Sequence, residues 1–438
     1  MRTIVRPKPD LHLLRIAKLP FCQATANTVQ IYLVGGAVRD RMLDIPPCER
    51  DWVVVGASPE QMLALGFRQI GRDFPVFLHP ETSEEYALAR RERKSGHGYA
   101  GFTCETGSQV SLEDDLARRD LSINAMAEDR DGHLIDPYGG AQDVRDGVLR
   151  HVSDAFVEDP LRVLRVARFM ARFASRGFRV HPATMTLMRD MAASGELAHL
   201  VAERVWTETR RALGEASPQE YFRTLRECGA LGAIFPEIDA LFGVPQPARH
   251  HPEIDTGEHV LLCLRLAAQL RLTEPARFAV LVHDLGKALT PRERWPSHVG
   301  HEKLGAVAVR ALCERLRVPV KYRELALVVC LHHTRCHRVL EMRAPAIVSL
   351  LEDVDALRNG ERFEEFLAAC EADARGRTGL EQRPYAQAEK LRRARAAAAT
   401  VTAASALARG LHGPQIAVEM HRLRCIEVAR LEGEDHGE

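Results

Sequence analysis

The segment at residues 31–56, IYLVGGAVRDRMLDIPPCERDWVVVG, constrains the fold most strongly, because paired glycines separate an apolar run from the start of a helix. Gly35 and Gly36 are expected to leave the first backbone amides of that helix uncovered. Such amides bind anions, and Arg39, on the first turn, can add a charge-assisted contact to a phosphate. The segment therefore predicts a strand, a phosphate-binding turn, a helix and a second strand.

Two acidic residues stand beside the second predicted strand. Glu49 and Asp51 are separated by one residue and precede the run WVVV. On an extended chain both carboxylates therefore point the same way. Two adjacent carboxylates repel one another unless a cation joins them. A phosphate-binding turn that faces an acid pair indicates metal-assisted phosphoryl or nucleotidyl transfer.

The chain has 438 residues, of which 46% are hydrophobic, and it contains 60 basic and 60 acidic residues. This length exceeds that of most single domains, so we expect two to four domains. Because the opposite charges balance, binding of a nucleic acid must depend on local basic surfaces. The ten cysteines are scattered with no CxxC pair, which favours reduced thiols and a cytoplasmic protein. No run of eighteen apolar residues occurs, so no transmembrane helix is predicted.

The hydrophobic pattern changes near Glu158. From Ile31 to about Arg150 short strands alternate with helices, and the expected strands are IYLV, WVVV, VFLH, INAMA and HLID. Between them, the run RRERKSGHGYAGFTCETG at residues 90–107 is interpreted as a basic loop, and an ordinary solvated loop is the alternative. After Glu158 the periodicity is helical almost to the end. The predicted fold class is therefore α+β, with an α/β head followed by helices alone.

A second charged motif, RRDLSINA, lies at the end of the predicted head. Arg118, Arg119 and Asp120 precede a short apolar segment, so a cation and a third carboxylate can lie near the first acid pair. We therefore include Asp120 among the candidate catalytic residues. The alternative is a solvated run of charges.

The helix that follows, EDPLRVLRVARF, carries an acid and a basic stripe. Asp159 and Pro160 are typical of a helix start, while Arg162, Arg165 and Arg168 recur at three-residue spacing. Asp159 and Arg162 point the same way, so they form an acceptor beside a donor. The pairing edges of cytosine and adenine both present an amine, which donates, beside a ring nitrogen, which accepts. The carboxylate of Asp159 and the guanidinium of Arg162 match these two groups. The alternative is a helix cap and a solvated basic face.

Taken in order along the chain, these motifs resemble those of bacterial CCA-adding enzymes, the tRNA nucleotidyltransferases of the class II nucleotidyltransferase superfamily that carry an HD domain. The resemblance covers residues 30 to about 430. The motifs that carry it are GGAVRD, ERDWVVVG, RRDLSINA, EDPLRVLRVARF, HDLGK and EADARGRTG.

The resemblance implies roles for particular residues of the head. Glu49 and Asp51 are implied as ligands of Mg²⁺, and Glu49 stands where many relatives have aspartate. The residues implied in contact with ATP or CTP are Gly36, Arg39, Arg119, Arg165 and Arg168, with Asp159 and Arg162 at the positions that read the base.

A second site is predicted around His283 and Asp284, which end an apolar helix. Imidazole and carboxylate suit divalent transition ions, so the two side chains can ligate one metal or form a bridged pair. With His259, His333 and Asp373 they occur in an order that resembles the HD phosphohydrolase pattern, which implies a metal site. His301 also occurs in this order along the chain, but it is not assigned as a ligand. His298, His332 and His337 are interpreted as surface residues or as supports behind the ligands.

The resemblance implies two activities. The head would add C, C and A to the 3' end of tRNA from CTP and ATP without a nucleic-acid template. The HD domain would hydrolyse phosphate esters as a 2',3'-cyclic phosphodiesterase, 2'-nucleotidase and phosphatase, with Ni²⁺ favoured. Two alternatives remain open, which are a poly(A) polymerase of the same superfamily and an HD phosphohydrolase whose head only binds nucleotide or RNA.

The predicted organisation follows from the motifs and the breaks between them. A final helix with His421, Arg422, Arg424 and Arg430 is expected to hold the tRNA body through phosphates, although a solvated face is the alternative. We expect a monomer or weak homo-oligomer. The expected segments are an extension (1–29), the head (30–150), a helical neck and body (151–255), the HD domain (256–375) and a helical tail (376–438).

Overall fold

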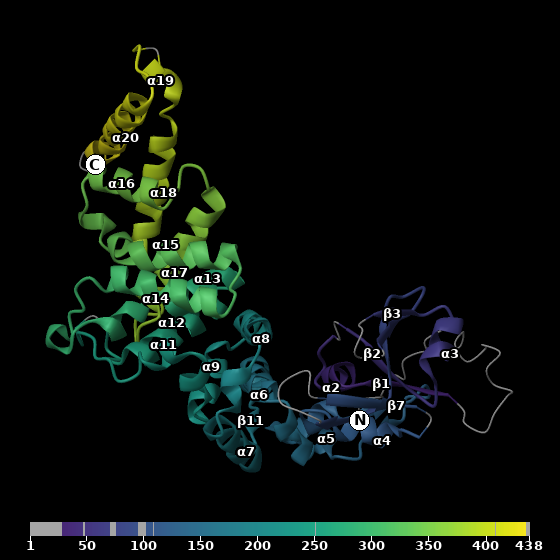
Figure 1. The fold of residues 1–438 in the computed structure, drawn as a ribbon. Coiled ribbons are helices and arrows are strands. Elements are labelled where there is room, and N and C mark those ends of the chain that lie inside the picture. The colour runs from purple at the N-terminus through teal and green to yellow at the C-terminus, as the bar shows by residue number, and fades with distance from the viewer. Residues whose placement is uncertain are drawn as a thin grey trace, which may run out of the picture. The chain divides into compact units, whose positions relative to one another are not determined.

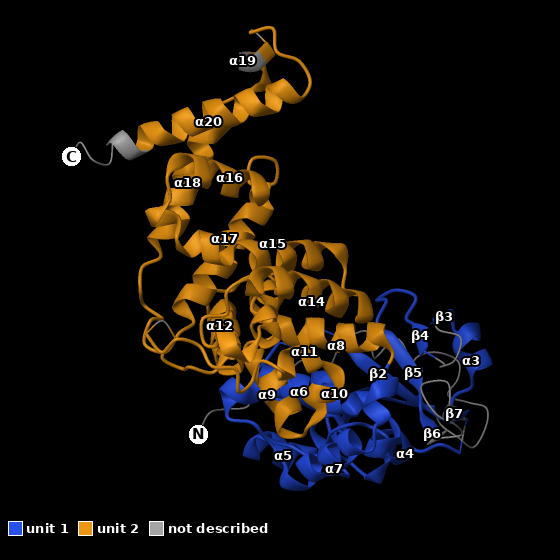
Figure 2. Cartoon of the chain, turned by 60° about the vertical axis from the view of Figure 1, so that its left-hand side comes forward, with its two compact units in different colours: residues 1–200 blue, residues 201–438 orange. Residues whose placement is uncertain are grey.

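The computed structural model describes residues 29–46, 49–70, 76–94, 102–107, 109–249, 251–407 and 409–434. The chain forms two compact units, residues 1–200 and 201–438 (Figure 2). The named strands all lie in the first unit, and the named elements of the second are all helical, so the α+β class is confirmed. The division between the units falls inside the predicted neck and body, and the finer domain boundaries stay predictions.

The first unit is built on a mixed seven-stranded sheet in the order β3-β4-β5-β2-β1-β8-β9 (Figure 1). The central strand β2 is antiparallel to β1 and parallel to β5. The outer pairs are antiparallel. The strands are β1 (Gln30–Val34), β2 (Asp51–Val55), β3 (Arg68–Ile70), β4 (Val76–Leu78), β5 (Glu85–Leu88), β8 (Ala127–Glu128) and β9 (Leu134–Ile135).

The glycine turn has the predicted structure. Helix α2 (Gly36–Met42) follows β1 directly, and Gly35 has a positive φ of 68°. A Cβ atom at Gly35 would lie 2.8 Å from Arg119 Nη1, so a larger residue would meet both backbone strain and the guanidinium. Apolar residues of β1 and β2, among them Val34 and Val53, pack against Leu112 and Leu116 of α4 (Leu112–Ala117) and form the core under this turn.

Two segments of the head differ from the sequence-based expectation. The first two residues of INAMA lie in a short 3₁₀ helix, η3 (Ser122–Asn124), and only its last residue enters β8 (Ala127–Glu128). Its backbone bends because the amide of Asn124 donates to Leu121 O, and the Asn124 side chain donates to Asp120. The ends of the predicted basic loop pair as the antiparallel strands β6 (Arg90–Lys94) and β7 (Phe102–Thr106), while residues 95–101 lie outside the described residues.

The first unit ends in helices that continue from the sheet. Helix α6 (Leu161–Phe173) has an amphipathic sequence, and its apolar residues are buried together with Arg162 and Arg168. Helix α7 (Pro182–Ala193) follows after a short parallel pair of β10 (Val148–Leu149) and β11 (Arg179–Val180). The helix expected after Glu158 is therefore confirmed.

The second unit contains a group of packed helices around an apolar centre (Figure 1). Helix α13 packs against α12, α15 and α17, because its residues 276–282 are almost entirely apolar and buried. None of the helices in the described ranges has the length and hydropathy needed to span a bilayer. The main helices are α8 (Ala202–Gly214), α9 (Gln219–Glu227), α12 (Thr256–Gln269), α13 (Glu274–Val282), α14 (His301–Arg315), α15 (Val320–His337), α16 (Ala344–Asp353), α17 (Gly360–Arg375), α18 (Ala386–Ala399) and α20 (Pro414–Glu434).

Candidate functional sites

The acid pair lies next to the glycine turn. Asp51 is the first residue of β2, and the register of the sheet sets it opposite Val34, which immediately precedes the turn. Glu49 precedes the strand and is exposed. Asp51 is also exposed, but the pKa of its carboxyl is raised. The surrounding protein atoms contribute most to this rise, and the charge of Glu49 adds to it, whereas Arg119 opposes it. The turn, the acid pair and Arg119 therefore share one edge of the head.

A third carboxylate, which the sequence did not single out, joins this pair. Glu85 of β5 is the register partner of Asp51 in the parallel pair of strands. Burial raises the pKa of Glu85, and the charges of Asp51 and Glu49 raise it further. Three neighbouring carboxylates form an arrangement that a divalent cation stabilises.

Arg39, which was predicted to contact a phosphate, is an internal residue in this structure. Its side chain is 3% exposed, and its Nε and Nη2 donate to Asp40 Oδ1 at 2.9 and 2.7 Å. Its Nη1 donates to the side chain of Asn124, and its guanidinium lies 5.1 Å from the ring centroids of both Phe169 and Phe173. Burial lowers the pKa of Arg39, although Asp40 opposes this effect. Arg39 thus joins α2 to α6, and its contact with a phosphate stays a prediction.

The RRD motif is tied to α6 by buried charges. Asp120 Oδ2 accepts from Arg165 Nε at 2.7 Å, and Asp120 Oδ1 accepts from Asn124 Nδ2 at 3.0 Å. Burial raises the pKa of Asp120, but Arg165 outweighs this effect and holds it well below its usual range. Asp120 is therefore a stable anion that positions Arg165, and its catalytic role stays a prediction.

Asp115 is another carboxylate that the sequence did not single out. Its side chain is fully buried, and it accepts from Arg118 Nη2 at 2.6 Å and from Arg119 Nη2 at 3.1 Å. The spacing of three and four residues across the C-terminal end of α4 was the signal for this triad. Asp115 therefore fixes the guanidinium of Arg119 beside the glycine turn.

The pair predicted to read a base has local partners. Asp159 Oδ1 accepts from the amide of Leu161 at 3.1 Å, so Asp159 caps the start of α6. Arg162 Nη1 donates to Ala155 O at 2.6 Å, and Arg162 Nη2 donates to Arg118 O. Arg168 lies over the ring of Phe169 at 4.4 Å. All these residues gather on one helix, and their roles toward a nucleotide stay predictions.

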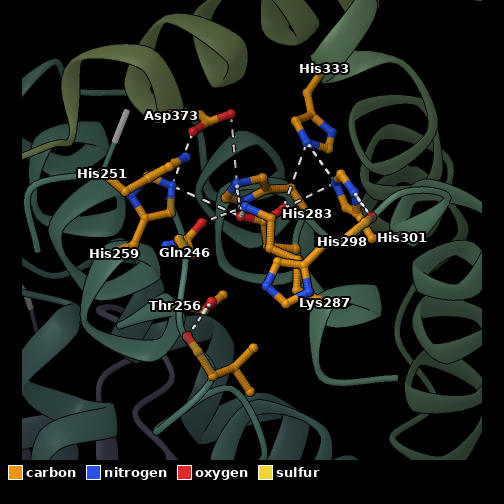
Figure 3. A network of polar contacts seen from close by, with 12 residues as sticks. Gln246, His251, Thr256, His259, His283, Lys287, His298, His301, His333 and Asp373 are labelled. Atoms are coloured by element: carbon orange, nitrogen blue, oxygen red, sulfur yellow. Dashed lines mark hydrogen bonds and ion pairs between the residues drawn. The ribbon is translucent and has the colours of Figure 1, made fainter. Parts of the chain in front are cut away.

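The second unit brings the five predicted metal ligands together (Figure 3). His259 Nε2 lies 3.1 Å from Asp373 Oδ1 and 3.9 Å from Asp284 Oδ2. His283 Nε2 lies 3.1 Å from Asp284 Oδ2 and 3.6 Å from Asp373 Oδ2. His333 Nε2 lies 3.6 Å from Asp284 Oδ1. All five side chains are buried, although they come from four different elements of the unit.

Backbone and carboxylate contacts orient the imidazoles. His283 Nδ1 lies 2.7 Å from Val280 O, and His259 Nδ1 lies 2.8 Å from Glu253 Oε1. Because these oxygens only accept, each Nδ1 donates and each Nε2 faces the centre of the cluster. This is the arrangement that proteins use to orient histidine ligands of metals.

The cluster fits a divalent cation. His283 Nε2 and Asp284 Oδ1 are buried and have no hydrogen-bond partner among the described residues. Burial lowers the pKa of His283, but Asp284 and Asp373 outweigh this effect and raise it to about 10. Burial raises the pKa of Asp284, but His283 and Lys287 hold it well below its usual range. The centre therefore requires positive charge, and a transition metal matches its nitrogen and oxygen donors.

A glycine allows the cluster to assemble. A Cβ atom at Gly286 would lie 1.9 Å from His301 O and 2.5 Å from Gly305 N. This close approach lets η7 (Leu285–Leu289), which follows Asp284, pack directly on the first turns of α14. The glycine of HDLGK therefore brings His301 toward Asp284.

Residues outside the predicted ligand set also contact the cluster, among them a glutamate and two histidines. Glu253 accepts from His259, His337 Nε2 lies 2.6 Å from Asp373 Oδ2, and His301 Nε2 lies 3.5 Å from Asp284 Oδ1. The interpretation of His337 as a support behind the ligands agrees with this contact. His298 is buried and contacts Thr290. His332 is half-buried and contacts Arg335.

Comparisons with known proteins match both units. The family described as "Poly A polymerase head domain" matches residues 31–150, and "HD domain" matches residues 256–360. A third family, "Probable RNA and SrmB- binding site of polymerase A", matches residues 177–242. The multifunctional CCA protein of Hahella chejuensis is 57% identical over 402 residues, which are 92% of this chain and 95% of the relative. That of Pseudomonas fluorescens is 57% identical over 91% of this chain and 98% of the relative.

The chain belongs to the multifunctional CCA protein family. This confirms the resemblance drawn from the motifs and the expectation of a CCA tRNA nucleotidyltransferase with an HD domain. The head and HD families both imply the use of divalent metals.

Solved structures of CCA-adding enzymes share the fold. The Bacillus stearothermophilus CCA-adding enzyme in complex with CTP has a TM-score of 0.63 at 23% identity, over 93% of this chain and 89% of that chain. The Thermotoga maritima CCA-adding enzyme complexed with tRNA has a TM-score of 0.59 at 18% identity, over 92% and 87% of the two chains.

The basic residues of the last helix all have acidic partners in this member of the family. His421 and Arg424 both contact Glu352, at 2.8 Å each. Arg422 lies 2.7 Å from Glu419, and Arg430 lies 2.6 Å from Glu427. The predicted helix is confirmed, and its contact with RNA phosphates stays a prediction.

We expect Gly286→Ala to weaken the metal cluster of the second unit. The added methyl group collides with backbone atoms of α14, which cannot rotate away, so the free energy of unfolding should fall by at least about 1–3 kcal/mol. Thermal unfolding should occur several degrees lower, and less metal should survive gel filtration. Leu289→Ala on the same element is the control, because that side chain is 54% exposed. An unchanged melting temperature and metal content would contradict this account of the glycine.

Proposed function

We propose that this chain completes the 3' end of tRNA by adding C, C and A from CTP and ATP in the cytoplasm. The observation that carries the proposal is the 57% identity with multifunctional CCA proteins over more than nine-tenths of the chain. The acid pair, the glycine turn and Arg119 at one edge of the head support it.

In the proposed reaction Glu49 and Asp51 would hold Mg²⁺, and Glu85 would add a third negative charge beside them. When bound, this ion supplies charge neutralisation for the 3'-hydroxyl and the α-phosphate during pyrophosphate release. The turn at Gly35 and Gly36 offers amides to the triphosphate, and Arg119 offers a guanidinium that Asp115 holds in place.

Base choice is assigned to Asp159 and Arg162. The carboxylate accepts from the amine that C and A share, and the guanidinium donates to the neighbouring ring nitrogen. Guanine and uracil place a carbonyl oxygen where the carboxylate lies and are repelled. Since the terminal nitrogens of Arg162 already donate to Ala155 O and Arg118 O, base recognition requires an exchange of these contacts. Arg165 and Arg168 complete the basic side of this helix.

The alternatives from the sequence are less well supported. The head family bears the name of poly(A) polymerase, but the curated relatives that match almost the whole chain are multifunctional CCA proteins. A head that only binds nucleotide has no need for three carboxylates so close together that the charges of Asp51 and Glu49 raise the pKa of Glu85. Incubation with tRNA that lacks its 3' end, labelled CTP and ATP separates these cases. Extension that stops after CCA supports the proposal, and long A tails favour the polymerase.

A second activity, phosphate-ester hydrolysis, is favoured by the buried cluster of His259, His283, Asp284, His333 and Asp373. Its donors converge, and His283 Nε2 and Asp284 Oδ1 have no hydrogen-bond partner within the part of the chain that the structure describes. These residues would hold a divalent transition metal, with Ni²⁺ preferred. A bound metal of this kind makes a water molecule nucleophilic toward phosphorus. The proposed substrates are 2',3'-cyclic phosphates, 2'-nucleotides and other phosphate monoesters.

We predict that Asp51→Ala lowers the rate of CCA addition by more than about 100-fold, because several kcal/mol of charge stabilisation depend on the metal. Primer extension with labelled CTP and magnesium measures the effect. Hydrolysis by the HD domain should stay at the wild-type rate, since its ligands lie in the other compact unit. Wild-type addition by this variant would remove Asp51 from the metal site.

Replacing His283 with Ala should abolish hydrolysis of a 2',3'-cyclic phosphate and leave CCA addition unchanged, because a buried donor to the metal is lost. Assays with Ni²⁺, Co²⁺, Mn²⁺ and Mg²⁺ measure the hydrolysis. His332→Ala, which removes a histidine outside the cluster, is the control. If the wild-type protein hydrolysed nothing with any of these metals, the HD domain would be a structural module.

Exchange of the base-reading pair should change nucleotide choice. A matched side-chain and base pair discriminates by about 1–3 kcal/mol, which is roughly tenfold to a hundredfold in incorporation. Asp159→Ala should relax discrimination, and Arg162→Ala should weaken the use of both CTP and ATP. The double variant Asp159→Arg with Arg162→Asp should gain GTP and UTP incorporation at the expense of CTP and ATP. Retention of C and A selectivity in all three variants would leave Asp159 as a helix cap only.

A further inference from the structure

The side chain of Asn124 links two buried arginine contacts of the first unit. Its Oδ1 accepts from Arg39 Nη1, and its Nδ2 donates to Asp120 Oδ1 at 3.0 Å. Asp120 Oδ2 in turn accepts from Arg165 Nε at 2.7 Å. Asn124, Arg39 and Asp120 are at most 6% exposed. One amide group therefore lies between an arginine of α2 and the carboxylate that holds an arginine of α6.

A second connection closes these contacts into a ring. Asp40 Oδ1 accepts from Arg39, and Asp40 Oδ2 accepts from Arg172 Nη2 at 2.8 Å. Arg165 and Arg172 are two turns apart on α6, so they lie on the same face of that helix. Helix α6 is thus attached at two points to the contacts of Arg39 on α2. We call this set of six side chains the polar ring: Arg39, Asp40, Asp120, Asn124, Arg165 and Arg172.

An amide is the group that satisfies both neighbours of position 124. The guanidinium of Arg39 only donates hydrogen bonds, and the carboxylate of Asp120 only accepts them. The side chain between them must therefore present one acceptor and one donor. A carboxylate would face Asp120 with like charge, and an alkyl group would leave two buried partners unsatisfied. The residue type at this position is consequently set by the two contacts together.

The backbone around Asn124 also supports the glycine turn. The amide of Gly35 donates to Met126 O at 3.1 Å, and Arg119 Nη1 donates to Asn124 O at 3.3 Å. The same Arg119 nitrogen is the atom that a Cβ at Gly35 would approach. The segment that carries Asn124 therefore lies directly behind the turn to which the triphosphate is assigned, while the ring connects it to the helix to which base choice is assigned.

We propose that Asn124 is a positioning residue for nucleotidyl transfer, and that its side chain keeps the base-reading helix α6 aligned with the triphosphate-binding turn. This inference rests on the proposed function of the head. The two parts of a nucleotide must be bound at a fixed separation, and the polar ring fixes that separation from below the site. When the link at Asn124 is broken, affinity for the nucleotide and discrimination between bases should fall together.

Asn124→Leu tests the link on the full chain, because leucine has a similar size and makes neither hydrogen bond. Its affinity for CTP and ATP, measured by equilibrium dialysis with labelled nucleotide, should fall roughly tenfold to a hundredfold. Incorporation of UTP relative to CTP into tRNA that lacks its 3' end should rise. Thermal unfolding shows that each variant is folded at the assay temperature.

Ser122→Ala is the matched control. Ser122 lies on the same 3₁₀ helix and is buried, and its hydroxyl donates to Asp143 Oδ2 at 2.6 Å, outside the polar ring. This variant should be less stable but should keep the affinity and base selectivity of the wild type. A lower melting temperature for Asn124→Leu with unchanged affinity and selectivity would overturn the proposal and leave Asn124 as a purely structural residue.

Asn124→Asp gives a second test with an expected reversal of sign. The new carboxylate can still accept from Arg39, but it faces Asp120, so affinity for CTP should fall. Adding Asp120→Asn should then restore part of the affinity, although Asp120→Asn alone should lower it. Recovery is partial because the amide of Leu121 also donates to Asp120 Oδ1, at 2.8 Å. If Asp120→Asn lowered the affinity in both backgrounds, the proposal would be wrong, even where Asn124→Leu did not fold.

The dialysis measurements separate this proposal from the proposed function. They need no tRNA, so they report on the alignment of the site whether or not the chain extends an RNA. A wild-type protein that binds CTP but adds nothing to tRNA would remove the proposed function. The affinities of the Asn124 and Asp120 variants would then still support or overturn the positioning role.

Discussion

Mutual repulsion among electron-rich groups is the constraint that governs both sites of this protein. In the head, the register between β2 and β5 holds Asp51 beside Glu85, and the charge of Asp51 raises the pKa of Glu85. In the second unit, imidazoles and carboxylates converge on a buried centre. The sheet register holds the carboxylates of the head in place, and contacts at Nδ1 hold the histidines of the second unit. The rest of the fold therefore supplies the free energy that opposes the repulsion within each site.

The sequence was sufficient where a local pattern carries the structure. The glycine turn, the strands around it and the helical remainder follow from short runs of residues, and the order of the motifs indicated the family. Contacts between distant segments were not visible in the same way. Glu85 joins the acid pair through a parallel strand pairing that no local spacing encodes. His301 faces Asp284 because Gly286 permits a close packing of α14, and this packing appears only in three dimensions.

Arginines illustrate the limit of inference from residue type. The motifs suggested that Arg39 and Arg162 face a nucleotide, because guanidinium groups suit phosphates and bases. In the structure both are buried, and they donate to Asp40, to Asn124 and to carbonyl oxygens. A guanidinium has five donors, so one side chain can bind the fold together and still belong to a site. The arginines that were predicted to contact the nucleotide therefore also attach helix α6 to the head.

The acidic partners of the last helix change what salt should do to RNA binding. Each basic side chain of this helix is already paired with Glu352, Glu419 or Glu427, so it must exchange that carboxylate for a phosphate when it binds RNA. The net release of counterions is smaller in such an exchange than when an unpaired lysine or arginine binds, because the displaced carboxylate attracts cations in turn. The affinity of this helix for RNA would therefore depend less steeply on ionic strength than its four basic residues suggest.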